Sequence, residues 1–96
     1  MRARNVDKNQ VAIVAALRAA GATVQHLHEV GAGCPDLLIG FRGSNYLIEV
    51  KNAAAGGSLN AEQVKWHRDW RGDVRVFTTP GQAFDFVREL ARGAHR

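Results

Sequence analysis

The sequence predicts an α/β fold in which a mixed four-stranded sheet is flanked by helices, in the order α-β-β-β-α-β-α. Three segments carry apolar residues at helical spacing, and four short segments between them are rich in β-branched and aromatic residues. At 96 residues the chain is long enough for one compact core and too short for two. We therefore expect a single domain over residues 1–96.

The first helix is expected over residues 8–20. Asp7 is placed as its N-cap, and Gln10 three residues later completes a capping box. Gly21 follows where a left-handed C-terminal residue is favoured. Four apolar residues recur at helical spacing and predict its buried face: Ile13, Val14, Leu17 and Ala20.

Three short segments with strand character come next, over residues 23–28, 37–41 and 46–51. The second and third have the pattern of a β-hairpin. A two-residue turn at Gly43-Ser44 suits type II′, which favours glycine first, and it pairs Arg42 with Asn45.

The second helix is expected to begin after Asn60 and to reach about Trp70. Asn60 and Gln63 repeat the capping-box spacing, and Gly72 ends the helix. Trp66 and Trp70 lie one turn apart, which is typical of a core pair, although an exposed pair would be able to stack on nucleic-acid bases.

A fourth strand is expected over residues 74–78, followed directly by the last helix. Thr79, Pro80 and Gln82 form a helix start, with proline in the first turn. Three apolar residues at helical spacing predict the face that packs on the sheet: Phe84, Val87 and Leu90.

Composition limits the possible functions. No run approaches the ~20 apolar residues of a membrane-spanning helix, and no signal peptide is recognisable, so we expect an intracellular, cytoplasmic protein. Cys34 is the only cysteine, which excludes a disulfide or a cysteine-based zinc cluster within one chain. A net charge of +4 is compatible with a polyanionic partner.

Three charged residues interrupt the hairpin strands, whose other residues are mostly apolar. Glu49 and Lys51 point to one face because side chains alternate along a strand. In the predicted register Asp36 lies opposite Lys51, and directly opposed residues project to the same face. Asp36, Glu49 and Lys51 are therefore expected to converge, on the side away from the core.

Two neighbouring carboxylates form a site for a hard divalent cation such as Mg²⁺, with Mn²⁺ as a substitute. The backbone carbonyl of Val50 is a candidate further ligand. Such a cation makes water more acidic and neutralises charge on a phosphodiester, while the Lys51 ammonium is placed to orient or deprotonate the attacking water.

The same residues resemble a known family. Pro35-Asp36 followed by Glu49-x-Lys51 is similar to the motif of the PD-(D/E)xK nuclease superfamily, and the surrounding pattern resembles its VRR-NUC and Holliday-junction-resolvase-like branch. This resemblance implies a restriction-endonuclease-like core and a metal-dependent endonuclease that acts on DNA. It also implies Asp36 and Glu49 as metal ligands, Lys51 as the catalytic lysine, and Gln63 as a further residue lining the site.

The chain departs from that pattern in its first helix. Many members of the superfamily carry a metal-binding glutamate there, whereas this chain offers Gln10 or Asp7. A glutamine is a neutral and weaker ligand. The number of metal ions therefore stays open.

Our expectations for the substrate and the partners rest on the size and charge of the chain and on its resemblance to the nuclease superfamily. We expect a homodimer that binds DNA, with branched or junction DNA as one candidate substrate. Four basic residues are candidates for contacts with phosphates: Lys8, Arg42, Lys65 and Arg68. The alternative is a DNA-binding module on the same fold that does not cleave.

Overall fold

The computed structural model describes residues 8–93 of the chain. Its elements, in chain order, are α1 (Lys8–Ala20), β1 (Thr23–His26), β2 (Leu37–Phe41), β3 (Ser44–Val50), the short 3-10 helix η1 (Ala53–Ala55), α2 (Ala61–Asp69), β4 (Val74–Phe77) and α3 (Pro80–Ala91). The predicted fold class and the predicted order of elements are confirmed.

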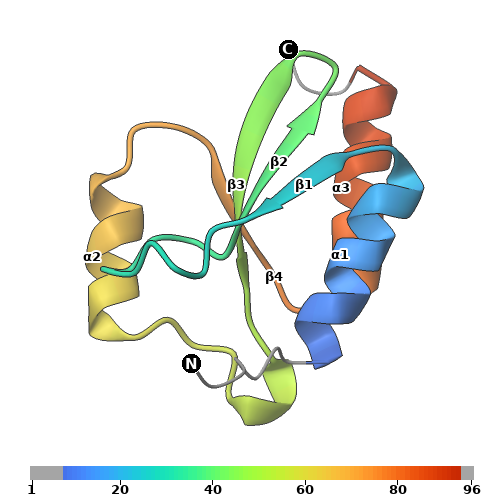
Figure 1. The fold of residues 1–96 in the computed structure, drawn as a ribbon. Helices are drawn as coiled ribbons and strands as arrows, with labels where there is room; N and C mark the ends of the chain where they lie inside the picture. The colour runs from blue at the N-terminus through green and yellow to red at the C-terminus, as the bar shows by residue number, and fades with distance from the viewer. Residues whose placement is uncertain (1–7, 94–96) are drawn as a thin grey trace.

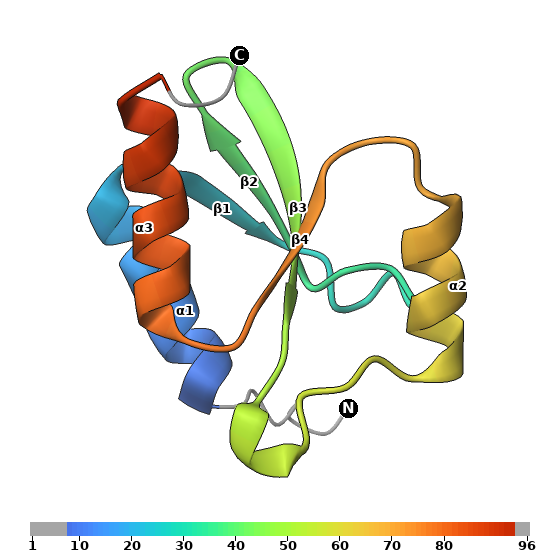
Figure 2. The same cartoon turned by 180° about the vertical axis from the view of Figure 1, so that it is seen from behind.

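The four strands form one mixed sheet in the order β1-β2-β3-β4. β1 with β2 and β2 with β3 are antiparallel, whereas β3 and β4 are parallel and are joined by a crossover through α2. Helices α1 and α3 lie side by side on one face of the sheet, and α2 lies on the other (Figures 1 and 2). The sheet is therefore the middle layer, and its two faces have different neighbours.

The hydrophobic core lies between the sheet and the α1–α3 pair. The apolar stripe predicted for α1 is buried, and Gly21 after it has a φ of 114°. β3 contributes Ile48 and Val50 to this core. Because side chains alternate along a strand, Glu49 between them points to the opposite face, toward α2.

The hairpin turn differs from the prediction. It is formed by Arg42 and Gly43, with φ values of 51° and 83°, so that Phe41 pairs with Ser44. Positive φ at both central residues is the property of a type I′ turn, which matches the twist of the strands. Gly43 is the second central residue of this turn, whereas the prediction had made it the first.

This change moves the register by two residues. Leu37 pairs with Ile48, so continuing the register by one residue places Asp36 opposite Glu49 and not opposite Lys51. A shift of two residues keeps every side chain on its predicted face, since the period of a strand is two. The predicted core face is therefore confirmed although the predicted pairing is wrong.

Helix α2 also differs from the prediction. Described over its whole length, it has no buried residue, and Trp70 just beyond it is 46% exposed. The core interpretation of Trp66 and Trp70 is therefore wrong: their rings stack on each other, with centroids 4.6 Å apart. The sequence shows their helical spacing but not that only one side of α2 faces the sheet.

The capping box predicted at Asn60–Gln63 is present, and the predicted start of α3 at Thr79 also forms a capping box, with Gln82. The buried face of α3 is formed by Ala83, Phe86, Val87 and Leu90, while Phe84 is 39% exposed. Phe84 was therefore wrongly assigned to the core face. Asp7, the predicted cap of α1, lies outside the described residues.

Strand ends differ by one or two residues from the expected ranges. The first strand ends at His26, the third begins at Ser44 and ends at Val50, and the fourth ends at Phe77. Within residues 8–93, no helix combines the length and the apolar character needed to cross a bilayer.

Candidate active site

Glu49 is the centre of the candidate site. Its side chain is 2% exposed, and it is the only charged residue among the buried residues of the described part of the chain. Strand alternation directs it away from the core, into the space between the end of β3 and the start of α2. A carboxylate in such a place needs polar partners, because burying it alone costs several kcal/mol.

Gln63 supplies those partners and joins Glu49 to Lys51. Its Nε2 donates to Glu49 Oε2 at 3.1 Å, and its Oε1 accepts from Lys51 Nζ at 2.7 Å. The same Oε1 accepts from the Asn60 backbone N–H at 2.9 Å and so completes the capping box. One side chain therefore both caps α2 and fixes two charged residues of β3. Lys51 Nζ lies 3.6 Å from Glu49 Oε2.

Asp36 reaches the same place from the residue just before β2. Its Oδ2 accepts from the Val50 backbone N–H at 2.8 Å, and its own carbonyl accepts from Leu27 N–H at 2.8 Å. Pro35 beside it is fully buried and fixes the approach of the chain. Because N–H and C=O of one strand residue leave on the same side, the Val50 carbonyl also faces Asp36.

The two carboxylates affect each other. Burial, followed by the charge of Asp36, raises the pKa of Glu49 to about 8, and Lys51 opposes this shift only in part. Glu49 Oε1 is buried and accepts no hydrogen bond from residues 8–93. A buried oxygen without a donor, next to a second carboxylate, is a position that a cation would satisfy.

The donor set fits Mg²⁺ or Mn²⁺ better than a zinc ion. The described residues contain no group of three or more His, Cys, Asp or Glu side chains that could hold a metal. A structural zinc site needs four such ligands, whereas Mg²⁺ is held by one or two carboxylates and keeps several waters. Asp36, Glu49 and the Val50 carbonyl would be the ligands from this chain.

The first helix reaches the site through a residue that the sequence analysis missed. Asn9 Nδ2 donates to the carbonyls of Lys51 at 2.7 Å and Thr78 at 3.0 Å, so it ties the ends of β3 and β4 to α1. Gln10, the next residue, lines a groove with His26 and makes no hydrogen bond to Asp36 or Glu49. The sequence shows a polar residue at the start of this helix, but it does not indicate which two carbonyls accept hydrogen bonds from Asn9.

His67 is a second residue that the sequence analysis missed. It lies one turn after Gln63 on α2, and its Nε2 is buried with no hydrogen-bond partner in the described part of the chain. Burial, and then the nearby Lys51 ammonium, lowers the pKa of His67. The sequence signal for this position was its spacing of four residues from Gln63, which places both side chains on the same side of a helix.

The four predicted phosphate contacts do not gather at the site. Lys65 and Arg68 both pair with Asp69, at 2.6 and 3.4 Å, on the exposed side of α2. Arg42 lies at the hairpin turn, at the far end of β3 from Glu49, and donates to the carbonyl of Ala91. Lys8 is exposed at the start of α1.

Comparison with known proteins gives one informative similarity. No family model matches the sequence, and no curated protein matches it. A solved structure described as "VRR_NUC domain" is similar in fold, with a TM-score of 0.65 and 26% sequence identity. The similarity covers 92% of this chain and 95% of that one. The chain therefore has the fold of a VRR_NUC domain, which belongs to the PD-(D/E)xK nuclease family that its motifs resemble.

Proposed function

We propose that the protein is a metal-dependent endonuclease that hydrolyses phosphodiester bonds in DNA. The observation that carries this proposal is the buried Glu49 carboxylate, held beside Asp36 and joined to Lys51 through Gln63. A strongly perturbed carboxyl group next to a second carboxylate and a lysine is typical of catalytic sites. The VRR_NUC fold supports the same conclusion.

Each residue has a role that follows from its position. Asp36 and Glu49 hold the divalent cation, with the Val50 carbonyl beside them. When bound, the cation neutralises charge on the phosphodiester and makes water more acidic. Lys51 orients the attacking water as an ammonium, or accepts its proton when present as the neutral amine, and Gln63 keeps the lysine within 3.6 Å of Glu49.

A purely structural role for these residues is less consistent with the geometry. A cross-strand pair on a solvated face contributes about 0.2–1 kcal/mol. Glu49, however, is not solvated, and one of its oxygens has no donor among the described residues. An arrangement that lowers stability in the absence of a ligand is expected where a ligand binds.

Cleavage assays test the proposal directly. Purified protein is mixed with supercoiled plasmid and with branched, flapped and linear DNAs, in Mg²⁺, Mn²⁺ or chelator. We expect cleavage with either metal and none with chelator. Asp36→Asn and Lys51→Ala should lower the rate by roughly 10²–10³-fold, since the first weakens the hold on the cation that neutralises charge and the second removes the cationic group beside the attacking water. Gln63→Ala, which acts through Lys51 and Glu49, should lower it by roughly 10–100-fold.

An exposed carboxylate on α3 provides the control. Asp85→Asn removes one negative charge far from the site and should cleave as the wild type does. Equal activity in Asp36→Asn and Asp85→Asn would refute the site assignment. The second candidate, a module that binds DNA without cutting, is favoured by the missing contact between Gln10 and the carboxylates. Binding without cleavage under both metals would establish it.

A further inference from the structure

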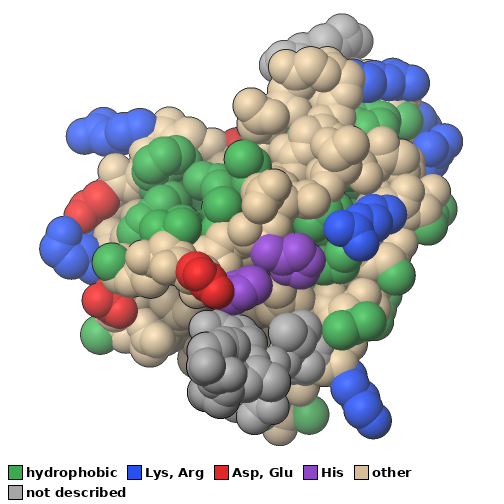
Figure 3. Space-filling model, in the orientation of Figure 1, with side chains coloured by type: hydrophobic (Ala, Val, Ile, Leu, Met, Phe, Trp, Pro, Cys, Tyr) green, Lys and Arg blue, Asp and Glu red, His purple; other side chains and the backbone are tan. Residues whose placement is uncertain are grey.

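A groove lies on the face of the sheet that α2 partly covers. We call it the Trp70 groove, and its walls are formed by Leu38, Asn45, Tyr46, Leu47, Trp70, Gly72 and Asp73. Its volume of about 310 Å³ lies at the lower end of the range of small-ligand sites, ~300–1,000 Å³. On this side of the molecule hydrophobic side chains gather between α2 and the strands (Figure 3).

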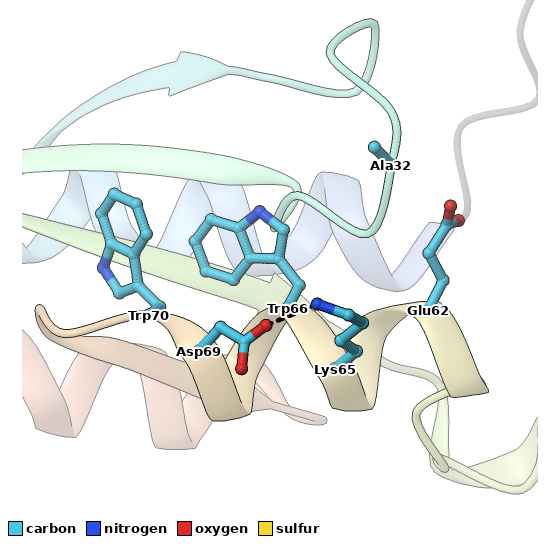
Figure 4. A pocket seen from close by; sticks show the side chains of 6 residues that line it. All are labelled: Ala32, Glu62, Lys65, Trp66, Asp69 and Trp70. Atoms are coloured by element: carbon cyan, nitrogen blue, oxygen red, sulfur yellow. Dashed lines mark hydrogen bonds and ion pairs between the residues drawn. The ribbon is translucent and has the colours of Figure 1, made fainter.

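Trp70 is the prominent residue of this groove. Its side chain stacks on Trp66, with ring centroids 4.6 Å apart and planes at 18°. Both indoles project from α2 toward the strands and the loop that carries Ala32 (Figure 4). A Cβ at Gly72 would lie 2.8 Å from Trp70 Nε1, so the glycine leaves room for the ring in this position. Trp70 remains 46% exposed.

The groove lies on the same face of the sheet as the candidate site. Along β3 the residues on this face are Glu49 and then Leu47, while on the neighbouring chain Asp36 is followed by Leu38. Two residues along a strand span about 6.7 Å, which is close to two stacked base steps of ~3.4 Å each. Leu38 and Leu47 line the groove, so its apolar floor begins about two bases from the carboxylates.

We propose that the Trp70 groove binds an unpaired base of the DNA next to the bond that is cut, an inference that rests on the proposed nuclease function. Indole rings stack on bases of any sequence, and the apolar floor of Leu38 and Leu47 suits the other face of a base. The protein is then selective for DNA with unpaired nucleotides near the cut, such as a flap or the open centre of a branched molecule.

One polar residue in the groove and one next to Trp70 in the chain support this ligand class, and the Asp73 carboxylate in the groove is paired with Arg75. The side-chain amide of Asn45 makes no hydrogen bond to another described residue, and amides of this kind pair with base edges. Arg71, next to Trp70, is exposed and forms no ion pair within residues 8–93, so it is available to a phosphate. Lys65 and Arg68, by contrast, are both engaged with Asp69.

The surroundings favour a base over a second protein surface. A stable interface buries about 800 Å² on each partner. None of the other large exposed hydrophobic residues lines the groove; they belong to α1, the loop after β1, α2, β4 and α3: Val11, Val30, Val64, Val76 and Phe84. The apolar surface at Trp70 therefore suits one flat ring.

Binding of single-stranded DNA in chelator tests the inference without cleavage. The probe is a fluorescein-labelled single-stranded oligothymidylate, followed by fluorescence anisotropy. Trp70→Ala should weaken binding by roughly 5- to 100-fold, the range expected for loss of stacking on one base. Trp70→Phe keeps an aromatic face and should stay close to the wild type. Trp70→Leu keeps apolar volume without that face and should resemble Trp70→Ala.

Phe84→Ala is the matched control, because it removes an exposed aromatic ring on the opposite side of the sheet, and it should bind as the wild type does. Wild-type binding by both Trp70→Ala and Trp70→Leu would overturn the inference. So would light scattering that shows a dimer converted to monomers by Trp70→Ala, because the groove would then be a self-interface.

The same experiments separate this inference from the proposed function. Binding that depends on Trp70, with no cleavage under Mg²⁺ or Mn²⁺, supports the groove and refutes the nuclease. Cleavage with binding that is unchanged in both Trp70 variants supports the nuclease and refutes the groove.

Discussion

At the scale of single residues, Glu49 shows how the candidate chemistry and the stability of the fold oppose each other. The buried carboxyl has a pKa of about 8, because burial and the nearby Asp36 both disfavour its charged form. The unfolded chain exposes the same group with a pKa of about 4.3. The folded state therefore holds the proton more tightly than the unfolded state does.

The sign of the pH dependence follows from this difference. A raised pKa in the folded state gives stability that is complete below about pH 4.3 and is lost as the pH rises through about 8. We expect the metal-free protein to lose up to several kcal/mol from this group between pH 5 and pH 9. Glu49→Gln cannot ionise there, so it should remove this dependence and melt at a higher temperature than the wild type at pH 9.

Thermal unfolding with and without Mg²⁺ measures both effects. Added Mg²⁺ should raise the melting temperature of the wild type at pH 8 and leave that of Glu49→Gln unchanged, since ligand binding to the folded state stabilises it. Asp85→Asn, an exposed substitution, should keep both the pH dependence and the response to Mg²⁺. An unchanged pH profile in Glu49→Gln would contradict the assignment of the raised pKa.

At the scale of elements, the start of α2 is also part of the candidate site. Gln63 shares its Oε1 between the Asn60 N–H and Lys51 Nζ, so the first turn of the helix positions the lysine. Capping, which is usually a matter of stability alone, here shares a side chain with the candidate site. The capping box of α3 at Thr79 and Gln82 has no such second contact with Lys51 or Glu49.

This difference gives a matched pair of variants. Asn60→Ala and Thr79→Ala each remove the side-chain cap of one helix and should each lower the free energy of unfolding by about 1 kcal/mol. Only Asn60→Ala loosens the turn that holds Gln63, so it should also lower kcat. Chemical denaturation and cleavage rates measure the two effects. Equal kcat for both variants would show that the cap and the site are independent.

At the scale of the whole molecule, the small size of the chain determines how it can hold DNA. With 96 residues and a net charge of +4, one copy has limited surface for a duplex, and two of its predicted phosphate contacts are paired with Asp69. We therefore propose a homodimer, in which two sites address two strands or a junction.

Light scattering at working concentration, combined with cleavage assays over a dilution series, tests the dimer. We expect a mass of two chains and a specific activity that falls as the protein is diluted below the dissociation constant. A single-chain mass together with undiminished cleavage would refute this proposal.

Much of the fold and part of the site can be predicted from the sequence because their signals are local. Capping boxes, helical spacing and strand alternation each involve a few neighbouring residues, and they indicated the order of elements and the face of Glu49. The turn was missed because Gly43 suits the first position of a type II′ turn as well as the second of type I′. In the structure, Arg42 supports the type I′ turn by donating a hydrogen bond to the carbonyl of Ala91 on α3.

The sequence by itself determined which residues of β3 point away from the core, because the alternation of a strand survives a shift of two residues. Only the tertiary structure decided what meets them there. Gln63 bridges Glu49 and Lys51, Asn9 reaches the end of β3, and Trp70 stays exposed beside the sheet. These contacts join segments far apart in the chain, and their distances depend on how α1 and α2 pack on the two faces of the sheet.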